Sequence, residues 1–182
     1  MQHDTRERED ALSTRADNPF DEMIHRFEGQ YGRNQSAMIE AFGHAGWKKC
    51  GQGKNGRVAA SPCGQYVVRI SQEDEGFDRH VELCQTHADN KHFPKVHAHK
   101  TLPDGSLVTI MEKLEPLPKH LTTQRAQLTR QIAFGDTPNM SPSLREAAEI
   151  IRSQSDLQKD VHGGDILYRK SDRSLVITDP FR

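Results

Sequence analysis

The chain has 182 residues, enough for one domain or for two small lobes that share a cleft. Its 25 Lys and Arg nearly balance its 26 Asp and Glu, so net charge makes no case for nucleic acid or for an anionic membrane. No apolar run approaches the roughly 20 residues of a membrane helix, and no signal peptide is visible. With three widely spaced cysteines, expected to be reduced, these features predict a soluble cytoplasmic protein.

The first third of the chain predicts a tail followed by two helices. Residues 1–17 are charged and lack apolar periodicity, which is typical of a disordered tail. Residues 18–46 then predict two helices with apolar stripes at helical spacing, the first formed by Phe20, Met23, Ile24 and Phe27, the second by Met38, Ile39 and Phe42.

The middle of the chain predicts a small sheet with one helix. Strands are expected at 47–50, 57–60 and 65–70, a helix at 74–88, and further strands at 93–99 and 107–111. The second half predicts helices at 121–132 and 141–151, and then a hairpin with strands at 166–169 and 175–178. The expected fold class is therefore α+β.

Glycines recur in the pattern Gly51-x-Gly53-x-x-Gly56-x-Val58. Glycine lets backbone amides approach phosphate oxygens, so the pattern is compatible with a phosphate-covering loop. A dinucleotide-binding loop would lead from a strand to a helix. Here a strand follows, which favours a glycine-rich hairpin, either over a triphosphate or as a plain structural turn.

Acidic residues gather near the end of the chain. Asp160 and Asp165 lie on one loop, in the run Asp160-Val161-His162-Gly163-Gly164-Asp165, and Asp179 follows the predicted hairpin. Magnesium prefers such hard oxygen ligands and keeps part of its coordination for phosphate. The alternative interpretation is that these acids only cap loops.

Taken in order, these features resemble the protein kinase-like superfamily over about residues 47–181. The acidic loop and the run Val176-Ile177-Thr178-Asp179-Pro180 are similar to the divergent bacterial and bacteriophage members, including early protein kinases of T7-like phages. The resemblance implies a two-lobe fold, with an antiparallel sheet and one helix in an N-lobe (47–112) and a minimal, mainly helical C-lobe with a catalytic-like loop (113–182).

The resemblance also implies roles for individual residues. Gly51, Gly53, Gly56 and Val58 would cover the phosphates of ATP, and Glu82, or less favourably Glu75, would pair with the phosphate-binding residue of the third strand. The hinge that receives adenine would be Glu112, Lys113 and Leu114. Asp160 would be the catalytic base, and Asp165 and Asp179 would bind magnesium.

Several positions depart from the family pattern. Arg69 stands where the family has lysine, and Lys54 in the glycine loop is a candidate to reach the phosphates instead, although an exposed loop lysine is the simpler interpretation. Asp165 replaces an asparagine. The sequence given ends three residues after Asp179, where protein kinases continue with an activation segment and further helices. We interpret this as truncation after the metal-binding motif.

Two functions follow as expectations. The first is an ATP- and magnesium-dependent phosphotransferase that acts on a protein, a host-directed effector by analogy with the phage proteins. The second is a pseudokinase-like protein that inhibits or scaffolds a partner. Leu144, Ala147, Ala148 and Ile151 form the buried stripe expected of the helix at 141–151. The missing helices would nevertheless be expected to leave apolar surface, with Leu144, Ile151 and Leu157 as candidates if they are not fully covered, which predicts a homo-oligomer or a stable complex.

A stretch in the middle of the chain is rich in histidine and cysteine but lacks the spacing of a familiar zinc site; its members are Cys84, His87, His92, His97 and His99. The histidines are therefore expected at the surface, while Cys84 shares an apolar helical stripe with Phe77 and Val81.

Overall fold

The computed structural model describes residues 18–52, 56–136, 139–162 and 164–181. The expected tail (1–17), Gly53 and Lys54 lie outside the described residues. Among the residues that are described, no helix is both long enough and apolar enough to span a membrane.

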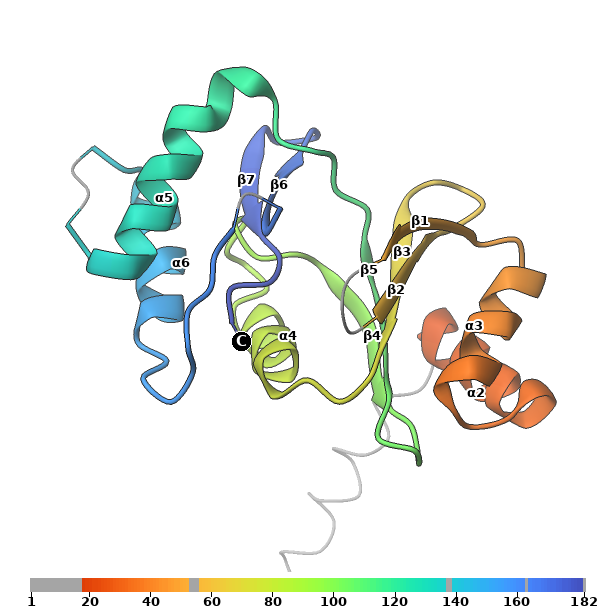
Figure 1. Ribbon diagram of the computed structural model, residues 1–182. Helices are drawn as coiled ribbons and strands as arrows, with labels where there is room; N and C mark the ends of the chain where they lie inside the picture. The colour runs from red at the N-terminus through yellow and green to blue at the C-terminus, as the bar shows by residue number, and fades with distance from the viewer. Residues whose placement is uncertain (1–17, 53–55, 137–138, 163, 182) are drawn as a thin grey trace, which may run out of the picture.

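Two helices precede the sheet, as the apolar stripes predict: α2 (Pro19–Tyr31) and α3 (Gln35–His44). Asparagine caps both, because the side chain of Asn18 accepts from the Phe20 N–H and that of Asn34 accepts from the Ala37 N–H. The two helices cover one face of the sheet (Figure 1).

The sheet has five antiparallel strands in the order β1-β2-β3-β5-β4. Their bounds are Lys48–Gln52 for β1, Gly56–Ala60 for β2, Tyr66–Ser71 for β3, Val96–Thr101 for β4 and Leu107–Glu112 for β5. Strand β4 begins later than the expected residue 93, because residues 90–93 form a turn closed by the Phe93 N–H and the Asn90 carbonyl, 3.1 Å apart.

Alternation along the strands divides the apolar residues between two clusters. Val68, Ile70, Val108 and Ile110 pack under α2 and α3. Leu107 and Met111 face α4 (Glu75–Thr86) on the other side, and Val67 packs against that cluster. Arg69, two residues after Val67, therefore also points toward α4.

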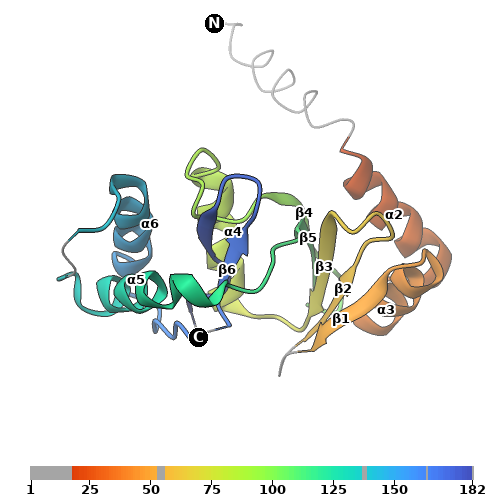
Figure 2. The ribbon, with the colours of Figure 1, turned by 90° about the horizontal axis from the view of Figure 1, so that it is seen from above.

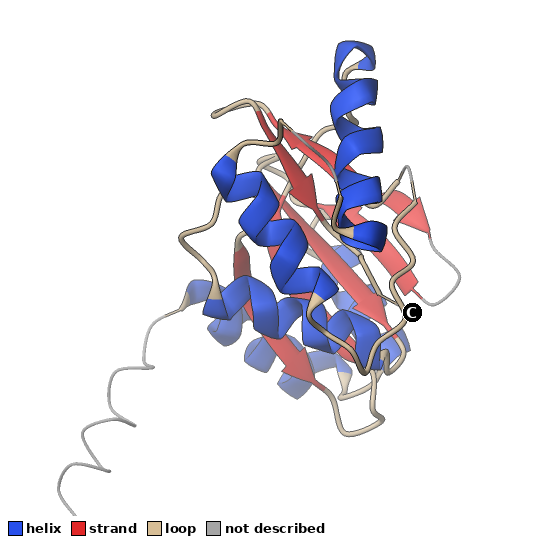
Figure 3. Cartoon of the chain, turned by 90° about the vertical axis from the view of Figure 1, so that its left-hand side faces the viewer, coloured by secondary structure: helices blue, strands red, loops and turns tan. Residues whose placement is uncertain are grey.

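The remaining elements form a second body of structure. A 3₁₀ turn (Lys119–Leu121) leads into α5 (Thr122–Phe134), which is followed by α6 (Pro142–Arg152) and by the hairpin of β6 (Ile166–Arg169) and β7 (Ser174–Ile177). Seen from above, the layers run from α2 and α3 through the sheet to α4 with the hairpin, and then to α5 and α6 (Figure 2). Figure 3 views the chain from the side of α5 and α6.

A third apolar cluster joins these layers, and it corrects one expectation. It includes Leu144 and Ile151 of α6, which are 7% and 0% exposed, and Phe181 near the end of the chain. Leu157 is partly buried against the same cluster. The predicted uncovered apolar surface is therefore absent at Leu144 and Ile151, because α4, α5 and the hairpin cover this face of α6.

The fold is thus α+β, with an antiparallel sheet, one helix between the sheet and the hairpin, and a short helical part. The order of elements is the order that the kinase-like resemblance implies.

Candidate functional site

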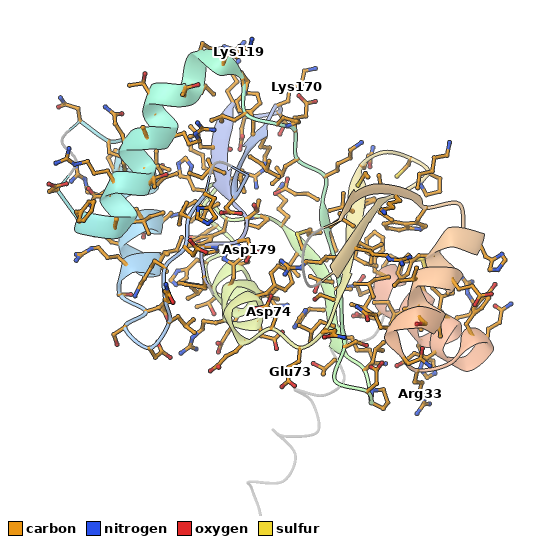
Figure 4. All side chains as sticks on the ribbon, viewed as in Figure 1. Arg33, Glu73, Asp74, Lys119, Lys170 and Asp179 are labelled. Atoms are coloured by element: carbon orange, nitrogen blue, oxygen red, sulfur yellow. The ribbon has the colours of Figure 1, made fainter. Side chains whose placement is uncertain are left out.

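Arg69 of β3 lies at the centre of a cluster of charged side chains. Its Nη1 donates to Asp179 Oδ2 at 2.9 Å and its Nη2 donates to Asp74 Oδ2 at 3.1 Å. Its guanidinium also stacks on the ring of Phe77, 3.6 Å from the ring centroid. Figure 4 shows Asp74 and Asp179 close together beside α4. Strand β3, the residue before α4 and the segment after β7 therefore meet at the guanidinium of Arg69.

Asp74, and not Glu82, is the acid from the α4 region that pairs with Arg69. Glu82 instead contacts Arg79 at 2.6 Å, with 62% of its side chain exposed. The reason is the phase of the helix, because the face of α4 that turns inward carries Phe77, His80 and Val81. Glu75, the second candidate, is also exposed. The expected pairing of Arg69 with Glu82 is wrong.

Backbone hydrogen bonds hold the acidic loop against the segment that contains Asp179. The Asp160 N–H donates to the Pro180 carbonyl at 3.0 Å, and the Thr178 N–H donates to the Asp165 carbonyl at 2.8 Å. The Asp160 carboxylate is largely buried and lies 2.9 Å from His162 Nε2. The loop that carries Asp160 and Asp165, before β6, and the segment that carries Asp179, after β7, are therefore held together at one end of the β6–β7 hairpin.

The electrostatics of this cluster favour an added cation. Burial raises the pKa of Asp179, and the Asp74 and Asp165 carboxylates raise it further, while Arg69 opposes the rise. Burial also raises the pKa of Asp165, against the His162 backbone N–H, which donates to its Oδ2. Such shifts mean that the site stabilises ionised carboxylates poorly, although Arg69 and His162 act in their favour.

The donor set fits a magnesium ion that is shared with phosphate. Among the described residues, no group of three or more His, Cys, Asp or Glu side chains could hold a metal alone. Magnesium, however, commonly uses one or two carboxylates and completes its shell with water and phosphate oxygens. Asp165 and Asp179 are two acids whose charges act on one another and supply that number.

A row of paired residues crosses the sheet beside this cluster. Gly51 pairs with Val58, Val58 with Arg69, and Arg69 with Thr109. Directly paired residues share a face, so Val58 and the side-chain-free Gly51 lie on the face that carries Arg69. The site residues on β1, β2 and β3 are thereby brought together.

Gly56 has a different surrounding. A Cβ built there would lie 2.7 Å from Ser71 Cβ and 2.8 Å from the Ile70 carbonyl oxygen. This position therefore needs glycine for the approach of β2 to β3, whatever else it does.

The backbone of the expected hinge is partly engaged within the protein. The Glu112 N–H donates to the Lys95 carbonyl at 3.0 Å and the Lys113 N–H donates to the Gln65 carbonyl at 2.8 Å. The Glu112 carboxylate is held by Arg169, whose Nε donates to its Oε2 at 2.8 Å. Within the described part of the chain, the Leu114 N–H donates no backbone hydrogen bond, unlike the N–H groups of Glu112 and Lys113.

Sequence reasoning missed several residues around Arg69. Asp74 and Phe77 could have been found from the predicted start of the helix at residue 74, since an acid at that position is a typical N-cap. His99 was expected at the surface, but its Nδ1 lies 2.8 Å from Thr109 Oγ1 and its Nε2 lies 3.0 Å from Asp78 Oδ1. His92, away from Arg69, was also expected at the surface but is buried, and its Nδ1 donates to the Leu175 carbonyl at 2.7 Å.

Comparison with known proteins yields structural neighbours only. No family model matches the chain, and no curated protein matches its sequence. Among solved structures, the kinase PK-1 of Cydia pomonella granulovirus aligns over 80% of this chain and 57% of its own, with 14% identity and a TM-score of 0.45. The PknI kinase domain of Mycobacterium tuberculosis aligns over 74% and 59%, with 16% identity and a TM-score of 0.43.

A third neighbour is a phosphotransferase of another kind. The streptomycin–ATP–APH(2″)-IIa ternary complex aligns over 87% of this chain and 69% of its own, with 13% identity and a TM-score of 0.39. The chain spans less than two thirds of the length of the two kinases above. Similarity at this level assigns neither a substrate nor an activity to this chain.

Proposed function

We propose that the protein is an ATP- and magnesium-dependent phosphotransferase of the protein kinase-like type that acts on a protein. The observation that carries this proposal is the meeting of Arg69, Asp74 and Asp179, with the Asp160–Asp165 loop hydrogen-bonded to the same segment. A fixed positive charge beside carboxylates is an arrangement that phosphoryl transfer can use, since this chemistry depends on positioning and charge stabilisation.

Each residue has a distinct role in this proposal. Arg69 would bind phosphate oxygens, and the Leu114 N–H would donate a hydrogen bond to the adenine ring. Asp165 and Asp179 would hold magnesium, which when bound neutralises the charge that develops on the transferred phosphoryl group. Asp160, kept in place by the Pro180 carbonyl and adjacent to His162, would accept the proton of the attacking hydroxyl.

A second candidate function is a pseudokinase-like protein that inhibits or scaffolds a partner. It is favoured by the direct ion pair between Arg69 and Asp179 at 2.9 Å, because a carboxylate already paired within the protein would bind magnesium less readily. Two of the three hinge N–H groups are also engaged by the protein itself. In either case we propose that the protein partner is a phage or bacterial host protein or a second copy of this chain.

One experiment separates the two functions. ATP binding is measured by calorimetry with and without magnesium, on the wild type and on Asp179→Ala, with transfer of labelled phosphate followed in the same samples. A phosphotransferase requires binding that depends on both magnesium and Asp179, with label appearing on the protein or on an added extract. Binding without transfer favours the pseudokinase, and absence of binding in the wild type rejects the phosphotransferase.

A further inference from the structure

Arg69 divides its two terminal nitrogens between acids from two different elements. Nη1 contacts Asp179, near the end of the chain, and Nη2 contacts Asp74, directly before α4. Phe77 covers one face of the guanidinium at 3.6 Å, and only 17% of the Arg69 side chain is exposed. The orientation of the guanidinium plane is therefore set by α4 as well as by the strand that carries it.

Asp74 uses its two carboxylate oxygens for two separate tasks. Oδ1 accepts from the Phe77 N–H at 3.1 Å and caps α4, while Oδ2 accepts from Arg69 Nη2 at 3.1 Å. The residue whose N–H is capped, Phe77, is also the residue whose ring stacks on Arg69. Asp74, Phe77 and Arg69 thus form a closed set of contacts that links the start of the helix to β3.

We propose that Asp74 is the positioning residue for Arg69 in nucleotide binding, a role that rests on the proposed function. With Nη2 held by Asp74, Arg69 keeps its orientation when Asp179 engages a cation, and Nη1 becomes available to a phosphate oxygen. Arginine suits this division because its planar fork offers donors in fixed directions, whereas the ammonium of lysine is a single point of charge. Arginine at position 69 and its pairing with Asp74 instead of Glu82 are then connected, because the fork of the guanidinium lets Asp74 hold Nη2 while Nη1 becomes available.

The pairing is tested first without any nucleotide. Arg69→Gln, Asp74→Asn and the double variant are unfolded in urea, and the unfolding equilibrium constants form a double-mutant cycle. We expect the change in the unfolding equilibrium constant of the double variant to differ by about fivefold or more from the product of the two single changes, because the residues are in contact. The same cycle on the exposed pair of Arg130 and Asp136, whose contacts are 3.0 Å, should give a smaller coupling.

The role in nucleotide binding is tested on the full chain with magnesium–ATP. Asp74→Asn keeps an oxygen for the Phe77 N–H but removes the charge that faces Arg69, and Asp74→Ser keeps only a capping oxygen. We expect both variants to raise the Kd and the KM for magnesium–ATP about tenfold, with a smaller change in kcat, because a charge-assisted contact is lost in the ground state. In the Asp74→Asn background, Arg69→Lys should add little. The matched control, Asp136→Asn, lies outside the site and should leave Kd and KM unchanged.

The outcomes distinguish the positioning role from the proposed function. An additive cycle for Arg69 and Asp74 overturns the positioning role whether or not nucleotide binds. If the wild type binds and transfers phosphate but Glu82→Gln raises KM while Asp74→Asn does not, the positioning role is wrong and the phosphotransferase stands. If the wild type binds no nucleotide, the proposed function fails, and the role of Asp74 in nucleotide binding fails with it, even where the cycle shows coupling.

Discussion

Gly56 illustrates how one residue type serves different needs within a single pattern. Its neighbours Ser71 and Ile70 leave no room for a Cβ, whereas a Cβ at Gly51 would meet Val58 Cβ at an ordinary 3.5 Å. The pattern of glycines therefore combines one position that the sheet requires with another that it does not. Only the spacing between β2 and β3 distinguishes them.

We predict that Gly56→Ala destabilises the protein by about 2 kcal/mol, because β2 must shift away from β3 to admit the methyl group. Gly51→Ala is the matched variant and should change the free energy of unfolding by less than about 1 kcal/mol. Urea unfolding of both variants provides the comparison. Equal losses for the two variants would contradict the packing role of Gly56.

The raised pKa of Asp165 makes the stability of the protein depend on pH. Burial raises its pKa in the folded protein, so the folded state holds the proton more tightly than the unfolded state does. Ionisation of Asp165 therefore costs stability at pH values above its unfolded pKa of about 3.9.

We accordingly expect Asp165→Asn, which still accepts from the His162 N–H, to be more stable than the wild type at pH 7. The gain should stay below about 1 kcal/mol because the residue is half exposed and solvent screens its charge. It should shrink as the pH falls and vanish below about pH 3.9. Thermal unfolding across this range measures the difference. Asp136→Asn should behave in the opposite way, because Arg130 lowers the pKa of Asp136; matching trends for the two variants would refute this account.

At the scale of elements, α4 contacts the final segment of the chain closely. Gly76 in its first turn approaches Phe181 so nearly that a Cβ there would lie 3.0 Å from Phe181 Cβ. Phe181 is 5% exposed and belongs to the cluster that joins α4, α6 and the β6–β7 hairpin. The position of Asp179, two residues earlier, therefore depends on how this ring packs.

Phe181→Ala should destabilise the protein by about 3 kcal/mol, as is usual when a buried aromatic ring is removed. It should also weaken magnesium–ATP binding, because Asp179 loses the support of the segment that follows it. Phe134→Ala is the control, since the ring of Phe134 is 74% exposed, and its effect should stay within about 0.5 kcal/mol. Denaturant unfolding and calorimetry measure the two effects. A Phe181 variant as stable as the Phe134 variant would disprove the role of the cluster.

At the scale of the whole molecule, one buried ion pair connects the sheet to the hairpin. Glu112 at the end of β5 accepts from Nε and Nη2 of Arg169, at the end of β6, and Arg169 also donates to the Phe93 carbonyl at 2.9 Å. Arg169 is 7% exposed. A backbone bridge between Glu115 and Tyr168 lies beside this pair. Together these contacts fix the end of β5 and the segment after it relative to the β6–β7 hairpin.

We predict that Glu112→Gln costs about 3 kcal/mol in unfolding free energy, because it removes the nearer counter-charge of the buried Arg169 guanidinium and leaves only Asp172, 3.4 Å from Nη1. The exposed pair of Arg130 and Asp136 has similar geometry, yet breaking it with Arg130→Gln should cost less than about 1 kcal/mol. Equilibrium unfolding in urea compares the two variants. Equal losses in the free energy of unfolding would mean that burial does not make the Glu112–Arg169 pair more important for stability than the exposed pair.

Much of the fold could be predicted from the sequence because its signals are local. Apolar spacing located α2 and α3, and Ser141 with Pro142 marked the start of α6. Alternation and turn residues located the strands, apart from the start of β4, where a turn at residues 90–93 competes with extension. These features depend on residues within a few positions of one another.

Sequence by itself thus determined the elements, their order and the three acids near the end of the chain. Only the tertiary structure decided which acid faces Arg69, since the phase of α4 directs Glu82 to solvent and places Asp74 beside the strand. Burial of Leu144 and Ile151 was decided in the same way, by elements that are distant in the chain. The physical reason is that periodicity specifies which residues share a face, whereas what covers that face depends on long-range packing.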